Sequence, residues 1–384
     1  MTFHPAFFEG QFGMERETLR VDAAGRLAQT PHPFDEPSIT RDFCENQLEI
    51  ITPVCHSVDE MLETMAQYDA HARQVLAQNG ERIWLYSNPP HIGDESEIPV
   101  ANFTGEETNK RRYRELLEHR YGKRLMLYSG IHFNFSFSED FLHGIHAGAG
   151  DYAAWRDAAY LRLYQNLFRH SWLLVMLTAA SPWYDRSFDG DGLAGAVRSD
   201  YSSLRCSERG YWNEFIPILR HETLQDFCDS IQFYVDKGIL FSASEIYLPV
   251  RLKPRGVNSL DHLRQGISHI ELRMFDLNPL FPLGIDPQDL RFAHLLMLYL
   301  FEKPAFAYTP ELQAQAVRGH RNAARFDLEG VTIDGKPILE RAAEILDEMT
   351  RFFDGNENAQ DTVQYQRQKL YDRPCEHVTD AIYQ

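Results

Sequence analysis

The chain has 384 residues, of which 43% are hydrophobic and 12% aromatic, and its formal net charge is −18. This composition is typical of a folded globular protein and excludes a disordered one, while the length allows one large domain or two smaller ones. The negative charge argues against a nucleic-acid partner, because phosphate backbones are bound by clustered Lys and Arg. A nucleotide stays possible, since a local cationic pocket or a bound metal can override the global sign.

No segment predicts secretion or membrane insertion. The amino terminus lacks a basic region followed by an apolar run, so it does not resemble a signal peptide. The longest apolar runs, 172–180 and 295–301, are too short to span a bilayer. The five cysteines are scattered without Cys-x-x-Cys spacing, which predicts neither a disulfide framework nor a zinc–thiolate site. We therefore expect a cytoplasmic protein without membrane contact.

The first predicted strand carries a pair of carboxylates. Residues 13–21 alternate so that Glu15 and Glu17 share one face, and residues 23–25 predict the turn that follows. Carboxylates that face a common interior repel one another and resist losing water. Several of them in one place therefore indicate bound cations.

A second acidic cluster follows a loop rich in Pro and His. In residues 41–53, Asp42, Glu45 and Glu49 recur at intervals of three and four, which would stack them on one side of a helix. If the segment is extended instead, Glu45 and Glu49 still share a face. Helix and strand are both open here, and both arrangements gather acidic side chains.

Residues 129–137 predict a strand with one apolar and one polar face. The alternative is a half-buried strand whose polar face merely meets water. Two later segments, 245–253 and 270–274, repeat the alternation with charges added. The polar faces hold His132, Asn134 and Ser136 in the first strand, Tyr247, Arg251 and Lys253 in the second, and Glu271 and Arg273 in the third.

Helical spacing and capping residues predict helices over 57–79, 105–121, 151–180, 223–237, 286–303 and 337–353. The helix over 105–121 is basic, and its charges either serve a site or simply meet solvent. Residues 190–195 match a dinucleotide-binding glycine pattern, but no strand precedes them and no apolar helix follows. We therefore predict a loop there.

The residues alone favour metal-dependent phosphoryl chemistry in a cavity lined by a sheet. Oxygen ligands with at most one imidazole suit magnesium or manganese better than zinc. Arg251 and Arg273 near such ions would suit an anionic ligand that bears phosphate. The sequence has no phosphate-binding loop of the Gly-x-x-x-x-Gly-Lys type and no Gly-x-Ser-x-Gly nucleophile motif.

Several long motifs, in order along the chain, resemble the bacterial glutamate–cysteine ligase family and the ligase half of the bifunctional glutathione synthases. They include Phe-Gly-Met-Glu-Arg-Glu-Thr-Leu-Arg at 12–20, Ser-Gly-Ile-His-Phe-Asn-Phe-Ser at 129–136 and Ile-Glu-Leu-Arg-Met-Phe-Asp-Leu-Asn-Pro at 270–279. Shorter matches lie at 42–53, 113–117, 203–205 and 247–251.

This resemblance implies an α+β fold like that of glutamine synthetase, in which a curved, mostly antiparallel sheet forms a funnel and helices pack outside. It also implies a reaction in which ATP phosphorylates the side-chain carboxylate of glutamate and the amine of cysteine attacks the acyl phosphate. Magnesium or manganese would be the cofactor. A carboxylate is a poor acyl donor, so activation by ATP is chemically reasonable.

The resemblance also implies roles for individual residues. Arg273 would contact the transferred phosphate or glutamate, and Arg251 is a second catalytic candidate. Asn134 is a candidate for substrate binding, and Arg205 would hold the carboxylate of cysteine. The implied metal ligands are Glu15, Glu17, Asp42, Glu49, His132 and Glu271, and the implied cysteine pocket comprises Phe43, Tyr113, Leu117, Arg205, Tyr211 and Tyr247.

The match fades beyond about residue 304. We expect residues 1–384 to form a single catalytic domain, in which 305–384 make a divergent helical C-terminal part. Two alternatives are a γ-glutamyl ligase for another amino acid or amine, and a non-catalytic protein that binds glutamate or nucleotide. The first is open because an apolar pocket discriminates by only about 1–3 kcal/mol per methylene. The second would be expected to lose its acidic ligands, which are present.

Overall fold

The computed structural model describes residues 3–105, 108–148 and 150–379. Its main sheet is antiparallel throughout and follows the order β2-β3-β1-β5-β9-β8, with β4 paired to β1. The strands are β1 (Gly10–Val21), β2 (Ile39–Thr40), β3 (Gln47–Ile51), β4 (Arg82–Trp84), β5 (Ile131–Phe137), β8 (Val250–Lys253) and β9 (His269–Phe275). Small pairs are formed by β6 (Trp183–Asp185) with β7 (Ala196–Arg198) and by β10 (Thr332–Ile333) with β11 (Lys336–Pro337).

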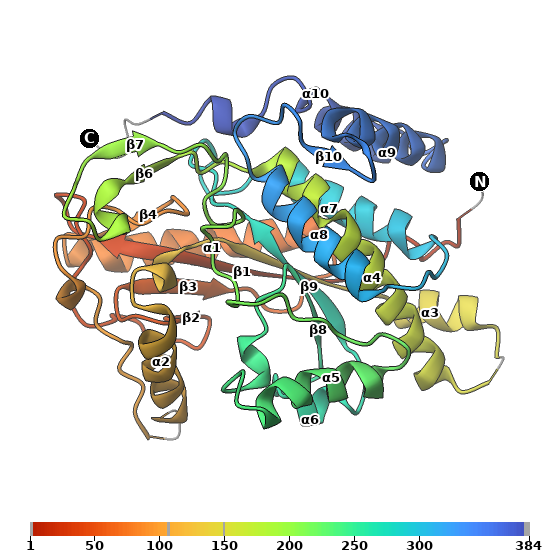
Figure 1. Cartoon of the computed structure of the whole chain (residues 1–384), viewed down its shortest axis with the longest axis horizontal. Helices are drawn as coiled ribbons and strands as arrows, with labels where there is room; N and C mark the ends of the chain where they lie inside the picture. The colour runs from red at the N-terminus through yellow and green to blue at the C-terminus, as the bar shows by residue number, and fades with distance from the viewer. Residues whose placement is uncertain (1–2, 106–107, 149, 380–384) are drawn as a thin grey trace.

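Helices cover one face of the main sheet (Figure 1). The apolar side chains of β5, from Ile131 to Phe137, are at most 3% exposed and share one core with this helical layer. The opposite face is therefore left for the polar side chains of the same strands. The helices that contribute to the layer are α1 (Val58–Gln78), α3 (Glu139–His146), α4 (Tyr152–Thr178), α7 (Pro287–Phe301) and α8 (Pro310–Ala323).

The other helices lie at the edges of the sheet or outside the main helical layer. In Figure 1, α2 (Thr108–Tyr121) stands at the lower left, α5 (Leu224–Asp236) and α6 (Leu260–Leu263) lie below the sheet, and α9 (Ile338–Phe352) and α10 (Glu357–Gln368) lie beyond α7 and α8. Within the described residues, none of the helices combines the length and apolar character needed to cross a membrane.

All six predicted helices are present, although residues 106 and 107 at the start of the second lie outside the described residues. The side chains of Ser57, Asp151, Thr223 and Asp286 cap four of them, as their sequences indicate. Residues 190–195 form a loop, as predicted. The predicted α+β class, with a mostly antiparallel sheet and helices packed outside, is confirmed.

One predicted strand is too long. Residues 245–253 were expected to be extended throughout, but β8 covers only Val250–Lys253. Residues 243–245 form a short 3₁₀ turn instead, because Glu245 is buried there and accepts bonds from Tyr121 and from the backbone of Phe241. The open question over 41–53 resolves as a loop followed by β3, with no helix.

The C-terminal helices pack against the rest of the chain through a buried ionic cluster. Lys369, which is 7% exposed, lies after α10 and forms ion pairs with Asp286 at 3.0 Å and with Asp289. Gln366 also donates a hydrogen bond of 2.7 Å to Asp289. Both aspartates stand at the start of α7, where a negative charge is favoured by the helix dipole.

Candidate active site

Antiparallel pairing brings the predicted polar side chains together from five strands, β1, β3, β5, β8 and β9. Residues directly opposite each other on one face of a sheet have neighbouring side chains. The polar side chains of each alternating strand therefore lie together on a single surface. The register pairs Glu15 with His132, Glu17 with Glu49, and Asn134 and Arg251 each with Glu271.

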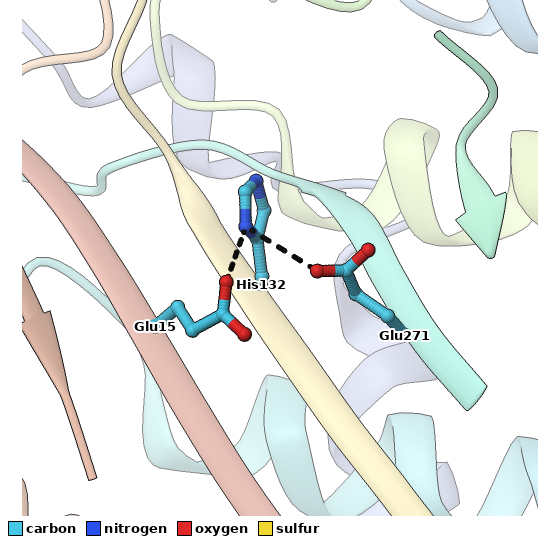
Figure 2. Close-up of side chains that lie close together, drawn as sticks. All are labelled: Glu15, His132 and Glu271. Atoms are coloured by element: carbon cyan, nitrogen blue, oxygen red, sulfur yellow. Dashed lines mark hydrogen bonds and ion pairs between the residues drawn. The ribbon is translucent and has the colours of Figure 1, made fainter. Parts of the chain in front are cut away.

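His132 lies at the centre of this surface. Its Nδ1 is 3.2 Å from an oxygen of Glu15 and 3.7 Å from an oxygen of Glu271, and its Nε2 is 3.6 Å from Glu17. Figure 2 shows the first two carboxylates converging on the imidazole from β1 and β9. His132 is only 2% exposed, so the alternative of a polar strand face that merely meets water does not describe it.

The carboxylates fall into two electrostatic groups. Burial disfavours the charge of Glu271, but Arg273 and Lys253 hold its pKa well below the usual value. Burial likewise opposes the charge of Glu15, yet its hydrogen bond with His132 leaves the pKa lowered. Glu15 and Glu271 are therefore ionised beside the imidazole.

The second group lies on the other side of His132. Burial and the negative charge of Asp42 raise the pKa of Glu49 well above its usual value, and burial raises that of Glu17. Carboxylates whose ionised form is disfavoured in this way are stabilised by a cation placed between them. Asp42 itself forms an ion pair with Arg114 of α2 at 2.8 Å.

Arg273 reaches the site through an irregularity in β9. The register between β5 and β9 shifts by one residue between Leu272 and Phe275, as in a β-bulge, and bulges re-aim side chains next to active sites. Its Nη1 donates a hydrogen bond of 3.2 Å to Glu271. Burial opposes the charge, but Glu271 and Glu17 raise the pKa of Arg273, so it stays cationic.

Arg251 is close to the site but is held by the backbone. Its Nε and Nη2 donate to the carbonyl of Ile246 at 3.2 and 2.7 Å, and Nη2 also donates to Ser244 at 2.7 Å. Arg251 therefore lies opposite Glu271 in the strand pairing, but the N–H groups of its guanidinium are directed at backbone carbonyls.

A pocket adjoins the carboxylates at the carboxyl end of β9. Arg205, Tyr211, Tyr247 and Arg273 line it, and the rings of Tyr211 and Tyr247 are 4.0 Å apart. Burial raises the pKa of both tyrosines, so both hydroxyls stay neutral. Of the remaining residues predicted for this pocket, Phe43 and Leu117 are buried in the apolar cluster that includes Tyr247, and Tyr113 packs against it.

Arg205 lines this pocket and is held against the backbone of β9. Its Nη1 and Nη2 donate to the carbonyls of Phe275 and Arg273 at 3.3 and 2.5 Å. A Cβ atom at Gly130 would stand 2.4 Å from the guanidinium carbon of Arg205. Gly130 is therefore needed for this close approach.

The sequence reasoning missed two residues at the site. Lys253 was placed on the polar face but given no role, and its Nζ lies 3.0 Å from Oε1 of Glu271. Glu245 was taken as part of a strand, but it anchors α2 to the pocket through Arg120 at 2.5 Å and Tyr121 at 2.8 Å. The basic face of α2 is thus partly used for anchoring, and no sequence signal pointed to either partner.

A cleft runs from the carboxylates toward the edge of the sheet. Glu15 and Asn134 form one end of it, and Asn134 donates a hydrogen bond of 3.2 Å to Glu15. Exposed Val54 and residues 254–256, directly after β8, also line it. The cleft and the pocket of Arg205 therefore meet the carboxylates from two directions.

Comparison with known sequences gives one consistent result. A family model described as glutamate-cysteine ligase matches residues 2–239 and 220–322. A glutathione biosynthesis bifunctional protein of Clostridium perfringens is 32% identical over 404 residues, covering 98% of this chain and 52% of the relative. That of Listeria monocytogenes serovar 1/2a is 37% identical over 313 residues, covering 76% of this chain and 40% of the relative. The chain spans about half, or less, of the length of these curated relatives.

Solved structures agree with the sequence comparison. A glutamate–cysteine ligase from Francisella tularensis, solved in complex with AMP, has a TM-score of 0.85 at 25% identity and covers 96% of this chain and 83% of its own. A bifunctional glutathione synthetase from Pasteurella multocida has a TM-score of 0.85 at 27% identity and covers 99% of this chain and 50% of its own. The predicted fold is thus confirmed over nearly the whole chain.

Proposed function

The chain belongs to the glutamate–cysteine ligase family, and on that premise we propose that it joins the γ-carboxylate of L-glutamate to the amine of L-cysteine, using ATP and passing through γ-glutamyl phosphate. The observation that carries this proposal is the convergence of Glu15, His132 and Glu271 beside Arg273, on the polar face of the sheet, opposite the main helical layer. A carboxylate-rich surface with one fixed guanidinium suits phosphoryl transfer between two anions.

Magnesium or manganese fits the side chains present. One ligand atom each of Glu15, His132 and Glu271 lies within 4.8 Å of the others. Oε1 of Glu271 and Oδ1 of Asn134 are buried and accept no hydrogen bond within the described residues. Oxygen-rich donor sets are those that hard divalent cations prefer. Glu17, Glu49 and Asp42 would hold a further cation, and such ions would screen the repulsion between the triphosphate and the carboxylates.

The residues of the chain would orient the reactants. Arg273 would contact the phosphoryl group as an oxygen of the γ-carboxylate attacks the γ-phosphorus and ADP leaves. The amine nitrogen would then attack the acyl carbon, inorganic phosphate would leave, and one proton would be released. No protein nucleophile is required. Arg251, whose Nε and Nη2 are bound to carbonyls, would contribute charge rather than a contact.

The pocket of Arg205 is proposed to receive the acceptor amino acid. Arg205 would bind its carboxylate, and Asn134 would contact the substrate glutamate. The aromatic wall of Tyr211 and Tyr247, with Phe43, Tyr113 and Leu117 behind it, would enclose a small side chain. We propose that residues 1–384 act as one catalytic domain, with the helices of 305–384 as its C-terminal part, and that the protein works in the cytoplasm.

The experiment is phosphate release from ATP with magnesium and glutamate, with cysteine compared against the other amino acids as acceptor. The proposal predicts release that depends on both glutamate and cysteine. Phosphate release with a different amino acid would support the same ligase reaction but show that the pocket of Arg205 receives an acceptor other than cysteine. Tight binding of ATP and magnesium without release in any mixture would favour the non-catalytic alternative instead.

A further inference from the structure

Lys253 is the last residue of β8 and stands beside the buried carboxylate of Glu271. Its Nζ lies 3.0 Å from Oε1, yet Oε1 accepts no hydrogen bond. Among the described residues, Nζ forms no hydrogen bond either. The side chain is 14% exposed, so the ammonium is largely shielded from water and is held by its ion pair with Glu271. An ammonium has three N–H donors, so its ion pair with Glu271 leaves donors that an anionic ligand can use.

Other cations around the site are already bound. Arg251 and Arg205 donate to backbone carbonyls, and Arg114 is paired with Asp42. Arg273 donates through Nη1 to Oε2 of Glu271. Lys253 and Arg273 thus flank the two oxygens of one carboxylate, and Lys253 alone of these five forms no hydrogen bond through its side chain within the described part of the chain.

Lys253 lies directly before residues that line the cleft. The residues that directly follow it, 254–256, line the cleft that ends at Glu15 and Asn134. Lys253 is also close enough to Glu15 for its charge to lower the pKa of that carboxyl group. A ligand that extends from the cleft to the carboxylates would therefore pass the ammonium. Phosphate oxygens are strong acceptors for such a group.

We propose that Lys253 is a catalytic residue that binds the β- and γ-phosphate oxygens of the nucleotide and supports the transfer of the γ-phosphoryl group. This inference rests on the proposed function. The ammonium moves from Glu271 to the phosphates when the nucleotide binds, so that Glu271 gains a free oxygen in the same step. No bond to Lys253 is made or broken, and the nucleotide supplies all the transferred atoms.

A second reading makes Lys253 a permanent counter-ion of Glu271. The two readings differ in what they predict for nucleotides of different length. A phosphate contact affects ATP and ADP, whereas AMP has no β- or γ-phosphate. A counter-ion that only organises the site affects all nucleotides alike, or none.

The test is isothermal titration calorimetry of the full chain with Mg-ATP, Mg-ADP and AMP, for the wild type and Lys253→Met. We expect Lys253→Met to weaken Mg-ATP binding about tenfold or more, as for the loss of a hydrogen bond to a charged group, and to change AMP binding less than about twofold. The kcat should fall as well. Equal weakening of ATP and AMP, or unchanged ATP binding, would overturn the proposal.

A matched control is Lys123→Met, since Lys123 is a 19% exposed lysine paired with Glu118 at 3.4 Å outside the sheet. It should leave all three affinities unchanged. If Lys253→Met does not fold, Lys253→Gln keeps a donor beside Glu271 and is judged by the same ratio of ATP to AMP affinity. Failure of the wild type to bind Mg-ATP would refute the proposed function, whereas a wild type that binds it and a variant that binds it equally well would refute only the role of Lys253.

Discussion

Glu17 of β1 and Glu49 of β3 lie directly opposite each other in the antiparallel pair. Side chains opposite each other in a sheet are close neighbours, and like charges at such positions are destabilising. Burial raises the pKa of both glutamates, and at Glu49 the charges of Asp42 and Glu17 raise it further. Two buried carboxylates at facing positions therefore lower the stability of the fold, and a cation bound between them would relieve this cost.

Glu49→Gln is expected to reduce the stabilisation by magnesium. The substitution removes one ligand charge but preserves volume, so the metal-free variant should be at least as stable as the wild type. A ligand at about a hundred times its Kd stabilises the folded state by about 2.7 kcal/mol, and this gain should shrink in the variant. Thermal unfolding during a magnesium titration measures it. Glu63→Gln, the same change on an exposed position of α1, is the control, and equal responses of Glu49→Gln and wild type would exclude Glu49 as a ligand.

Gly130→Ala should displace Arg205 without unfolding the protein. The added Cβ would meet the flexible end of the arginine, and loss of a charged hydrogen bond to the acceptor costs about 1.5–3 kcal/mol. We expect the KM for the acceptor to rise about tenfold or more, with the KM for ATP unchanged. Gly144→Ala, which would press on His4 in the same way, should change neither constant. A defect confined to ATP would contradict the position of the acceptor pocket.

Lys369→Met should strongly destabilise the chain. It would leave Asp286 and Asp289 buried without their cation, and breaking a buried ion pair costs about 3–5 kcal/mol. Lys336→Met removes a largely exposed pair with Glu344 and should cost at most about 1 kcal/mol. Urea unfolding of both variants gives the comparison. Equal, small losses would mean that the helices after residue 304 contribute little to the fold.

Asp289 should make the free energy of unfolding decrease as pH rises. Burial and the charge of Asp286 raise the pKa of Asp289 to about 6 from its usual 3.8, against the favourable charge of Lys369. Between these values the folded state holds more protons than the unfolded state, so this contribution to stability is lost as pH rises from about 4 to about 6. Asp289→Asn should flatten that slope in urea unfolding. The neighbouring Gln366 and Tyr365, which contact Asp289 and Asp286, do not titrate in this range. An unchanged slope would contradict the assignment.

The sheet could be predicted from sequence where a single alternation decided its faces. The polar faces of β1, β5 and β9 follow from a period of two, and antiparallel pairing then gathers Glu15, His132 and Glu271. The length of strand β8 was overestimated. The alternation continues back to Glu245, but the buried Glu245 lies in a 3₁₀ turn and not in the strand. Helix α3 was missed because it is only eight residues long, and α8 and α10 were expected only as part of a helical C-terminal region, without bounds.

Contacts that depend on side-chain direction could not be predicted. The sequence analysis put Arg251 near the expected metal ions, and the register pairs it with Glu271, but its hydrogen bonds to backbone carbonyls depend on the turn at 243–245. The approach of Lys253 to Glu271 crosses from one strand to the next, two residues along the register. Neither the carbonyl partners of Arg251 nor the contact of Lys253 with Glu271 can be read from the order of residues.

The most direct test of the account follows oxygen from glutamate labelled with ¹⁸O in its γ-carboxylate. If the carboxylate is phosphorylated before the amine attacks, the phosphate released with ATP, magnesium and cysteine must carry one labelled oxygen, because the bond between that oxygen and phosphorus is kept. Mass spectrometry of the phosphate shows this directly. We predict one ¹⁸O in each phosphate released, and phosphate without label would contradict activation of glutamate by phosphoryl transfer.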